Sequence, residues 1–324
     1  MEIITKPTHN DIKRSAIALK EGHLVAFPTE TVYGLGADAT NKNAVKRIYS
    51  VKGRPLDHPL IVHIASIEQV EKWAIEVPDY AMKLATEFWP GPITLILKKA
   101  KLAKNFITGG QKSVGLRVPS QSIALALLKE FAKLGGHGIA APSANKFGAV
   151  SPTYTQAVVE EIGQVMHNQD LILDGGFCKI GIESTIIDCT KSEPVMLRSG
   201  AITVEHLSQC LNVILKLETK STLRHSGNFQ SHYAPRASIL INQAPKAGDG
   251  LIALSEIETP NGVIRLCSPK NNAEYAHQLY SAFRKADKLN LVNISVFLPQ
   301  RGGIGESIID RINKAAAKPT IFLE

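Results

Sequence analysis

Residues 41–64 read NKNAVKRIYSVKGRPLDHPLIVHI, in which a helix pattern, a loop and a strand pattern follow one another directly. Apolar residues recur at helical spacing up to Gly53, which is typical of an amphipathic helix that ends at a glycine. Pro55 and Pro59 then fix backbone angles and favour extended geometry at the residues before them, so the loop is stiff. Residues 60–64, LIVHI, predict a short strand. The stretch therefore predicts an α/β fold in which a rigid basic loop precedes a strand.

The same mixture of helices and strands extends from residue 11 to about 213. Helical periodicity covers residues 11–22, 41–53, 66–74, 78–90 and 122–136. Strand patterns cover residues 23–28, 60–64, 92–99, 113–119, 138–145, 170–176, 183–189 and 194–198. The order does not follow a strict β-α-β alternation, and we therefore expect a twisted mixed sheet flanked by helices.

Residues 216–236, KLETKSTLRHSGNFQSHYAPR, are polar and lack apolar periodicity, so we interpret them as a linker. Beyond them the alternation becomes more regular, with strand patterns at 237–241, 251–256, 262–268 and 293–299 and helical patterns at 271–289 and 305–316. We therefore expect three parts: a larger α/β domain at 1–215, the linker at 216–236, and a small Rossmann-like α/β domain at 237–324.

The composition is that of an ordinary globular protein, with 44% hydrophobic and 20% charged residues among 324. This balance excludes a fibrous or an intrinsically disordered chain. Lysine and arginine exceed aspartate and glutamate by enough to give a net charge of +8. An excess of positive charge favours an anionic partner such as a nucleotide, pyrophosphate or RNA.

No targeting or membrane-spanning segment is visible in the sequence. The N-terminal residues lack the apolar core of a signal peptide, and no run of about 18 apolar residues occurs. We therefore expect a cytoplasmic protein that does not enter a membrane. The four cysteines are far apart and form no C-x-x-C pair, so we expect reduced thiols and neither a zinc site nor a disulfide framework: Cys178, Cys189, Cys210 and Cys267.

The segment PTETVYGLGADA, residues 28–39, is the first candidate for a binding loop. Its G-L-G lacks the third glycine and the following helix of a dinucleotide-binding loop, and the chain contains no P-loop motif. Thr29, Thr31 and Tyr33 supply hydroxyl groups just after a strand, where ligands often bind in open α/β sheets. The alternative is a turn in which a threonine caps the next helix.

The basic loop is the second candidate. Lys52 supplies a point charge and Arg54 a planar fork, and two such groups could hold different oxygens of one polyphosphate. We expect both in an exposed loop. His63, at the polar position of the following strand, could bind a carboxylate, although an ordinary strand histidine satisfied by its neighbours is the alternative.

The segment APSANKFGAVSPT, residues 141–153, is the third candidate. Ser143, Asn145 and Ser151 follow a strand in a loop whose backbone N–H groups could bind an anion, although a plain connection between elements is the alternative. Two arginines, Arg117 and Arg198, lie in apolar strands and must therefore be paired, either with a ligand or within the protein.

These groups exclude several kinds of chemistry. The chain contains no G-x-S-x-G motif, no H-E-x-x-H motif and no cluster of carboxylates for a metal cage. Cations, hydroxyls and one amide remain. They suit a reaction in which the substrate supplies the nucleophile, while the protein positions it and neutralises phosphate charge.

Several motifs that follow one another from about residue 23 to 200 resemble the YrdC family: FPTETVYGLGADA, KGRP, HPLIVHI, WPGPITLIL, VGLRVP, APSANKFGAVSPT, GIESTIID and VMLRSG. Lys52, Arg54, Ser143 and Asn145 match the K-x-R…S-x-N signature of this family in spacing and context. The linker end SHYAPR and the C-terminal region resemble the long form of the family. The resemblance implies a YrdC-like catalytic domain for residues 1–215.

The resemblance implies a reaction as well as a fold. Members of the family condense L-threonine with bicarbonate and ATP, as a magnesium complex, to give threonylcarbamoyl-adenylate and pyrophosphate. Other proteins then transfer the threonylcarbamoyl group to an adenosine beside the anticodon of tRNA. The protein would therefore be a nucleotidyltransferase in tRNA processing, with Mg²⁺ held mainly by the phosphates and no metal site of its own.

The resemblance also implies roles for individual residues. Lys52, Arg54, Ser143 and Asn145 would form the catalytic signature. The residues that would hold threonine are Thr31, His63, Arg117, Ala141 and Ser184, with Arg117 facing the carboxylate and the Ala141 carbonyl near the amine. The residues that would hold ATP are Arg54, His58, Ser113, Ser143, Ser151 and Arg198.

The linker ends in His, Tyr and Pro, which are poor choices for a purely flexible tether. Our hypothesis is that it folds back over the ATP pocket and that Tyr233 contacts the nucleotide. Two other functions stay open. A non-catalytic RNA-binding module would use the positive charge and bind RNA weakly. A carbamoyl-transferring maturation enzyme would need accessory zinc-binding segments, and the absence of C-x-x-C pairs counts against it.

Overall fold

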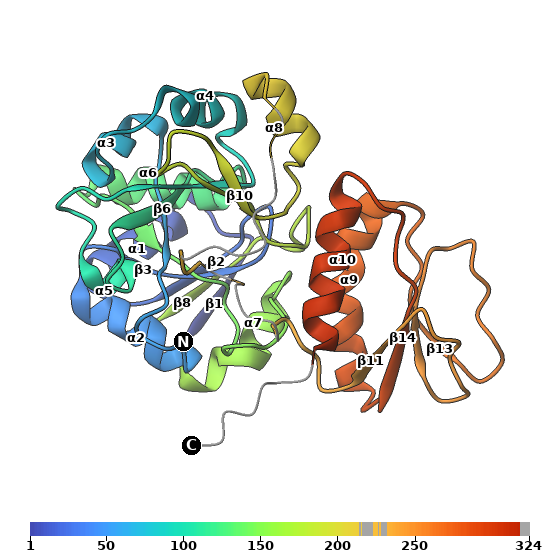
Figure 1. Cartoon of the computed structure of the whole chain (residues 1–324). Helices are drawn as coiled ribbons and strands as arrows, with labels where there is room; N and C mark the ends of the chain where they lie inside the picture. The colour runs from blue at the N-terminus through green and yellow to red at the C-terminus, as the bar shows by residue number, and fades with distance from the viewer. Residues whose placement is uncertain (214, 216–222, 226, 228–231, 318–324) are drawn as a thin grey trace, which may run out of the picture.

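The structure, a computed structural model, describes residues 1–213, 215, 223–225, 227 and 232–317. These residues form a larger unit around a ten-stranded sheet and a smaller unit around a four-stranded sheet (Figure 1). The larger sheet has the strand order β1-β8-β2-β3-β7-β4-β6-β5-β9-β10. Its strands are β1 (Glu2–Thr5), β2 (Val25–Phe27), β3 (Gly34–Asp38), β4 (Ile61–His63), β5 (Ile93–Lys98), β6 (Ser113–Arg117), β7 (Ile139–Ala140), β8 (Leu171–Asp174), β9 (Thr185–Asp188) and β10 (Val195–Arg198).

The larger sheet is mixed, as the sequence predicts. β1 and β2 run parallel to β8, β4 runs parallel to β6, and β5 runs parallel to β9. The remaining neighbours are antiparallel. The parallel pairing of β4 with β6 sets His63 opposite Arg117, and this register brings two of the candidate site residues side by side.

Helices cover both faces of this sheet, because successive residues of each strand point to opposite faces. Val25 and Phe27 belong to one core with α1 and α6, whereas Leu24 and Ala26 belong to another with α2, α4 and α7. The α-helices of this unit are α1 (His9–Lys20), α2 (Lys42–Lys52), α3 (Val70–Trp73), α4 (Asp79–Phe88), α5 (Asn105–Thr108), α6 (Ser122–Lys133), α7 (Thr155–Ile162) and α8 (Val204–Leu211). Two short 3₁₀ turns span Ile67–Gln69 and Gly163–Val165.

Local sequence sets the bounds of α2, the helix that leads into the site. The side chain of Asn41 accepts hydrogen bonds from the backbone N–H groups of Asn43 and Ala44, so it caps the free donors of the first turn. Gly53 ends the helix in the left-handed conformation. Lys52 is therefore the last helical residue, and the basic loop begins after it.

The smaller unit contains four parallel strands in the order β11-β14-β12-β13. Its elements are β11 (Ser238–Ile241), β12 (Gly250–Ile252), β13 (Ile264–Cys267), α9 (Asn272–Lys288), β14 (Asn293–Val296) and α10 (Ile304–Ala316). Figure 1 shows α9 and α10 between this sheet and the larger unit. The small α/β domain expected at the C-terminal end is thus present, with its helices turned toward the rest of the chain.

The core of the smaller unit continues into the larger one. Val32, Val150 and Ile182 pack in the same hydrophobic cluster as Tyr275, Tyr280 and Phe283 of α9. Gly181 has φ +89°, and a Cβ there would lie 2.5 Å from the carbonyl oxygen of Ala276, so only glycine allows this close approach to α9. The two units therefore share a packed interface.

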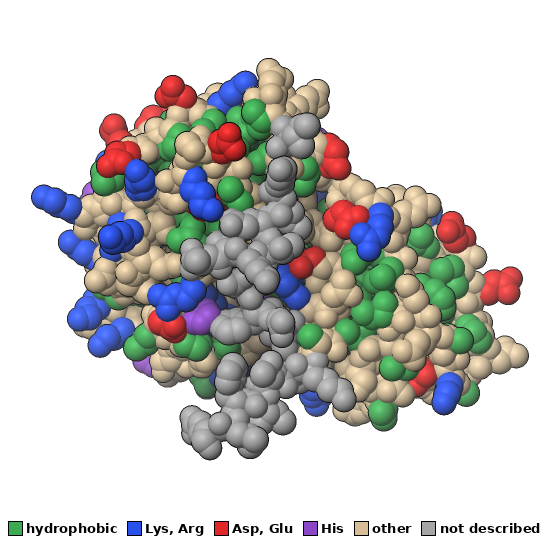
Figure 2. All heavy atoms as spheres, viewed as in Figure 1, with side chains coloured by type: hydrophobic (Ala, Val, Ile, Leu, Met, Phe, Trp, Pro, Cys, Tyr) green, Lys and Arg blue, Asp and Glu red, His purple; other side chains and the backbone are tan. Residues whose placement is uncertain are grey.

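No described helix is both long and apolar enough to cross a membrane. All four cysteines are free. On the face shown in Figure 2, lysine and arginine side chains stand singly or in small groups, mostly over the larger unit, with acidic side chains among them. The positive charge on this face is therefore spread out and does not form one continuous patch.

Candidate active site

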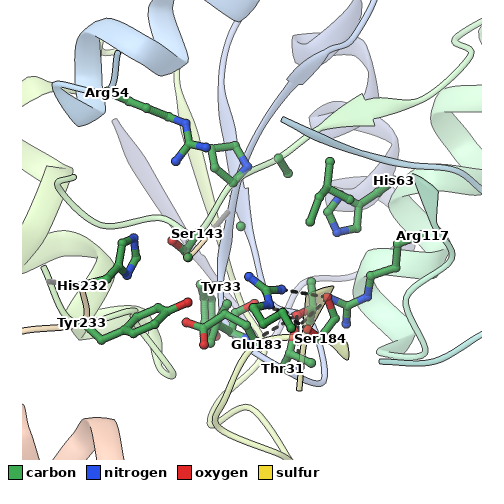
Figure 3. Close-up of a pocket in the computed structure, with 18 residues that line it drawn as sticks. Thr31, Tyr33, Arg54, His63, Arg117, Ser143, Glu183, Ser184, His232 and Tyr233 are labelled. Carbon is green, nitrogen blue, oxygen red and sulfur yellow. Dashed lines mark hydrogen bonds between the residues drawn. The ribbon is translucent and has the colours of Figure 1, made fainter. Parts of the chain in front are cut away.

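One pocket brings together segments that lie far apart in the sequence (Figure 3). Its walls come from the turn between β2 and β3, the loop before β4, the ends of β4 and β6, the segment after β7, the start of β9 and the end of β10. Gly227, His232 and Tyr233, from the end of the predicted linker, complete the lining. The lining of the pocket therefore combines residues of the larger unit with residues of the predicted linker.

All five residues expected to hold threonine line this pocket: Thr31, His63, Arg117, Ala141 and Ser184. His63 and Arg117 occupy neighbouring positions on β4 and β6. The Ser184 hydroxyl lies 2.8 Å from that of Thr94 and accepts a hydrogen bond of 3.1 Å from Arg198. The pocket thus offers hydroxyls, an imidazole and a guanidinium in one place.

Arg117 is paired inside the protein, the alternative that its apolar strand left open. Its guanidinium donates to Glu30 at 2.6 Å, to the Thr31 hydroxyl at 3.0 Å and to the Gly91 carbonyl at 3.3 Å. The guanidinium still has N–H donors beyond these bonds. It can therefore face a carboxylate in the pocket while Glu30 holds its orientation.

His63 is buried and neutral. Burial, and then the charge of Arg117, lowers the pKa of His63 to about 3. Its ring meets that of Phe27 edge to face at 6.0 Å, and its Nδ1 has no hydrogen-bond partner among the described residues. A neutral imidazole of this kind can exchange a hydrogen bond with a ligand without adding charge to the pocket.

Four of the residues expected to hold ATP line the same pocket: Arg54, Ser143, Arg198 and Tyr233. Arg54 donates to the Pro59 carbonyl at 3.0 Å and lies 5.8 Å from the centre of the Phe147 ring. Arg198 donates to the backbone and side-chain oxygens of Ser184 at 3.0 and 3.1 Å. Figure 3 shows Arg54 and Arg117 on different sides of the pocket. The pocket therefore has a guanidinium group on each of two sides.

The prediction that Lys52 and Arg54 lie in an exposed loop is wrong. Both side chains are buried, and Lys52 is the last residue of α2. The Lys52 ammonium donates to the carbonyl oxygens of Ser143, at 2.7 Å, and of Asn145. Burial, followed by the charge of Arg54, lowers the pKa of Lys52 well below its ordinary value. Lys52 therefore links the K-x-R segment to the S-x-N segment through hydrogen bonds inside the fold.

Asn145 shapes the same loop and does not line the pocket. Its amide donates to the carbonyl oxygens of Lys146 and Ala149 at 2.7 and 2.8 Å. The signature therefore divides into two pairs. Arg54 and Ser143 line the pocket, whereas Lys52 and Asn145 hold the loop behind them.

Three residues expected at the ATP lie elsewhere. His58 is half-buried, with its ring 5.7 Å from that of Phe147. The Ser151 hydroxyl is buried and donates to Glu183 at 2.7 Å. Ser113 begins β6 and lines a second pocket, together with Gln111 and several apolar residues. The second pocket adjoins the first, because Ile61 lines both.

Glu183 and His232 also line the pocket, although neither was predicted from the sequence to do so. Glu183 directly precedes Ser184 in the GIESTIID motif, and this position is the sequence feature that could have identified it as a pocket residue. Its carboxylate receives bonds from Ser151 of the larger unit and from Tyr280 and Arg311 of the smaller one. Sequence patterns could not reveal these last two, because they lie about a hundred residues away.

The pocket offers little to a metal ion of its own. Among the described residues no group of three or more His, Cys, Asp or Glu side chains could hold one. Glu183 is the carboxylate in the lining, and its oxygens already accept hydrogen bonds. These residues fit Mg²⁺ only as an ion carried by a phosphate ligand.

Two protein-family models match this chain. Residues 17–200 match the Sua5/YciO/YrdC family model, described as "Telomere recombination". Residues 202–317 match the model described as "Threonylcarbamoyl-AMP synthase, C-terminal domain". Together the two models cover both units of the fold.

Relatives of similar length are found among bacteria and archaea. The threonylcarbamoyl-AMP synthase of Pyrococcus abyssi is 39% identical over 326 residues, which covers 94% of each chain. That of Bacillus subtilis is 37% identical over 328 residues, or 94% of this chain and 92% of the relative. The crystal structure of P. abyssi Sua5 complexed with L-threonine is 36% identical, has a TM-score of 0.87 and covers 97% of each chain. The chain therefore belongs to the Sua5/YciO/YrdC family, in the long form that carries the additional C-terminal domain.

Proposed function

We infer that this chain condenses L-threonine, bicarbonate and ATP to threonylcarbamoyl-AMP, pyrophosphate and water. The relatives from P. abyssi and B. subtilis bear the name of this activity and match the chain across both units. The structural observation that carries the inference is the convergence of Thr31, His63, Arg117, Ala141 and Ser184 with Arg54, Ser143 and Arg198 in one pocket.

Threonine would bind at the β4–β6 side of the pocket. Arg117 would face its carboxylate, because the ion pair with Glu30 fixes the guanidinium and leaves N–H donors. The Ala141 carbonyl would lie near the amine, and the hydroxyls of Thr31 and Ser184 would complete the contacts. His63 is neutral, so the positive charge on this side comes from Arg117 and from Arg198, which donates to the Ser184 hydroxyl.

The protein would act by position and charge. The neutral amine of threonine attacks the carbon of CO₂ or bicarbonate, and a carbamate oxygen then attacks the α-phosphorus of ATP, which releases pyrophosphate. Negative charge grows on the phosphate oxygens in the second step. Arg54 and Arg198, with the Ser143 hydroxyl, would stabilise that charge, while Lys52 and Asn145 keep the Ser143 loop in place.

The nucleotide would extend from the first pocket into the second. The second pocket is lined by the apolar side chains of Leu60, Ile61, Ile96 and Ile186 and by polar side chains that come from Thr94, Gln111, Ser113, Arg224 and His225. A flat base suits such a lining. In this arrangement Ser113 binds ATP at a distance from the phosphates. His58 lies in the basic loop, and Ser151 acts through Glu183.

Mg²⁺ would enter with ATP. It would supply charge neutralisation for the phosphates, and the residues of the pocket would bind the complex through Arg54, Arg198 and Ser143. Chelation of Mg²⁺ should therefore stop pyrophosphate release. Calorimetry should detect Mg²⁺ binding only when ATP is present, and tight binding to the free protein would contradict this role.

The product is a mixed anhydride of a carbamic acid and AMP, so a transferase must consume it. We propose that the downstream threonylcarbamoyl-transferase machinery does so on tRNA. A role as a non-catalytic RNA-binding module is the competing function. That module would bind RNA with an affinity that falls steeply with salt and would not consume ATP.

Pyrophosphate release tests the proposal. The purified chain is incubated with ATP, Mg²⁺, bicarbonate and one amino acid at a time. Release should require both threonine and bicarbonate. Serine should be a poor substrate, because one missing methyl costs only about 1 to 3 kcal/mol of binding. Equal release with serine, or release without bicarbonate, would contradict the assignment.

A further inference from the structure

A buried cluster joins the smaller unit to the wall of the pocket. It consists of Glu183 and Tyr233, which line the pocket, and Tyr280 and Arg311, which come from α9 and α10. All four are buried, and Arg311 is fully so. The core of the C-terminal domain therefore reaches the site directly.

Glu183 depends on the C-terminal domain for most of its partners. Arg311 Nε donates to its Oε2 at 2.9 Å, and the Tyr280 hydroxyl donates to the same oxygen at 2.9 Å. Ser151 supplies the other bond, to Oε1 at 2.7 Å. Burial alone would raise the pKa of Glu183, but the charges of Arg311 and then Arg198 outweigh it and hold the pKa at about 2. The carboxylate is thus ionised and fixed in place.

The same two side chains hold Tyr233. The Arg311 guanidinium lies 5.4 Å from the centre of the Tyr233 ring, and the Tyr280 ring stacks on it at 5.7 Å with 25° between the planes. Tyr233 has φ +63°, a conformation that non-glycine residues adopt only when their surroundings impose it. Its hydroxyl has no hydrogen-bond partner among the described residues. The ring is therefore clamped while its hydroxyl stays available to a ligand.

The local charges explain why Glu183 needs Arg311 as a partner. Arg311 also pairs with Asp310 at 2.6 Å, and Asp310 pairs with Lys314 at 3.1 Å. The charges of Glu183, Arg311, Asp310 and Lys314 cancel. Arg198 in the pocket is the second cation whose charge favours the ionised form of Glu183, so without Arg311 the buried carboxylate would draw Arg198 toward itself.

We propose that Arg311 and Tyr280 are positioning residues of the active site, which orient Glu183 and Tyr233 and thereby keep Arg198 and Tyr233 ready for the nucleotide. The inference rests on the proposed function and deepens it. The C-terminal domain then contributes to ATP binding in this chain, in addition to packing against the larger unit.

Tyr280→Phe tests the proposal with the smallest change. It removes one hydrogen bond to Glu183 and keeps the stacking on Tyr233. Tyr275→Phe is the matched control: Tyr275 lies on the same helix, is equally buried, and donates to the Phe297 carbonyl at 2.8 Å within the C-terminal domain. The affinity for ATP and for threonine is measured by calorimetry on the full chain, together with the melting temperature.

Tyr280→Phe should weaken ATP binding about tenfold, since a hydrogen bond to a buried charge is lost, and should change threonine binding less than twofold. Tyr275→Phe should lower the melting temperature by a similar amount and leave both affinities unchanged. The proposal is overturned if the two variants have the same affinities. It is overturned equally if Tyr280→Phe weakens ATP and threonine binding in parallel.

A second pair of variants addresses Arg311. Arg311→Lys keeps the charge but loses the planar contact with Tyr233, and it should lower kcat/KM for ATP more than for threonine. Arg265→Lys is its control, because Arg265 donates to four backbone carbonyls within the C-terminal domain. Equal effects of the two arginine variants would show that Arg311 only stabilises the fold, and this result would overturn the proposal. If wild-type protein releases no pyrophosphate, the proposed function fails, whereas the ATP affinities still test the positioning role.

Discussion

Lys52 connects two parts of the site without entering it. Its ammonium binds the backbone carbonyls of Ser143 and Asn145, while Arg54, two residues later, lines the pocket. The two basic residues of the K-x-R segment thus lie in different places. Lys52 stays inside the fold, and Arg54 lines the pocket.

Replacement of Lys52 and Arg54 should therefore have different consequences. Lys52→Met leaves two buried carbonyl oxygens without a donor and should cost about 2 to 4 kcal/mol of stability as well as activity. Arg54→Met should lower kcat/KM for ATP on the order of 10² to 10³, with a smaller loss of stability. Thermal unfolding and steady-state kinetics measure both. Equal melting temperatures for the two variants would contradict this division.

His63 should make stability depend on pH. Its pKa is about 3 in the fold, against an ordinary value of 6.5, because burial and Arg117 disfavour the charged form. Between these values the unfolded chain binds a proton that the folded chain does not, so stability falls as the pH drops below about 6.5. Urea unfolding at pH 7.5 and pH 5.0 should show a larger loss for wild type than for His63→Gln. A parallel loss in both proteins would show that His63 does not titrate this way.

The predicted linker contacts the rest of the fold at two described residues, Arg224 and Tyr233. Arg224 pairs with Asp57 at 2.7 Å, donates to the Gly109 carbonyl, and exchanges backbone hydrogen bonds with the Gln111 side chain. Tyr233 is held at the other point by α9 and α10. The hypothesis that the linker closes the ATP pocket extends to residues 216–222, 226 and 228–231, which lie outside the described residues. The nucleotide contact of Tyr233 stays a prediction.

Tyr233→Ala should weaken ATP binding more than threonine binding. The ring lines the pocket on the side away from Arg117 (Figure 3), and burial raises the pKa of its hydroxyl to about 12, so it keeps a proton to donate. Tyr233→Phe should retain the clamped ring and lose only the hydrogen bond, with an intermediate effect. Calorimetric titration with each ligand measures the difference. Full ATP affinity in Tyr233→Ala would refute the contact.

The sequence predicted elements more reliably than contacts between them. Asn41 and Gly53 mark the ends of α2 in the sequence, and apolar runs predicted most of the strands, because these signals act over a few residues. The patterns missed β1, β3, α7 and α8, and β3 lies inside the segment that was interpreted as a binding loop. Burial of Lys52 and the bond of Ser151 to Glu183 depend on segments far apart in the chain. Periodicity carries no information on such contacts. Arg54, Ser143 and the residues expected to hold threonine, which the resemblance to a family singled out, line one pocket. The resemblance could not distinguish them from Lys52 and Asn145, which support the loop.

At the scale of the whole molecule, the two units share a core and cannot be separated without exposing it. A chain that ends at Val213 would leave Val32, Val150 and Ile182 without the helix α9 that covers them. It would also leave Glu183 without Arg311 and Tyr280. The interface therefore links stability to activity.

Truncation after Val213 should give a protein that melts at a lower temperature and makes little product. The residues proposed for threonine all remain, so threonine binding should survive better than ATP binding. Differential scanning calorimetry and titration with each ligand measure these effects. A truncated chain with wild-type melting and turnover would show that the C-terminal domain is dispensable.

If one pocket joins threonine, bicarbonate and the AMP part of ATP, a single defined product must form. The full chain is incubated with ATP, Mg²⁺, L-threonine and ¹³C-labelled bicarbonate, and the nucleotides are separated at once and identified by mass spectrometry. A species with the mass of AMP joined to threonine through one labelled carbonyl should form, in an amount equal to the pyrophosphate released. AMP or ADP without that species, or a product that lacks the label, would contradict this prediction.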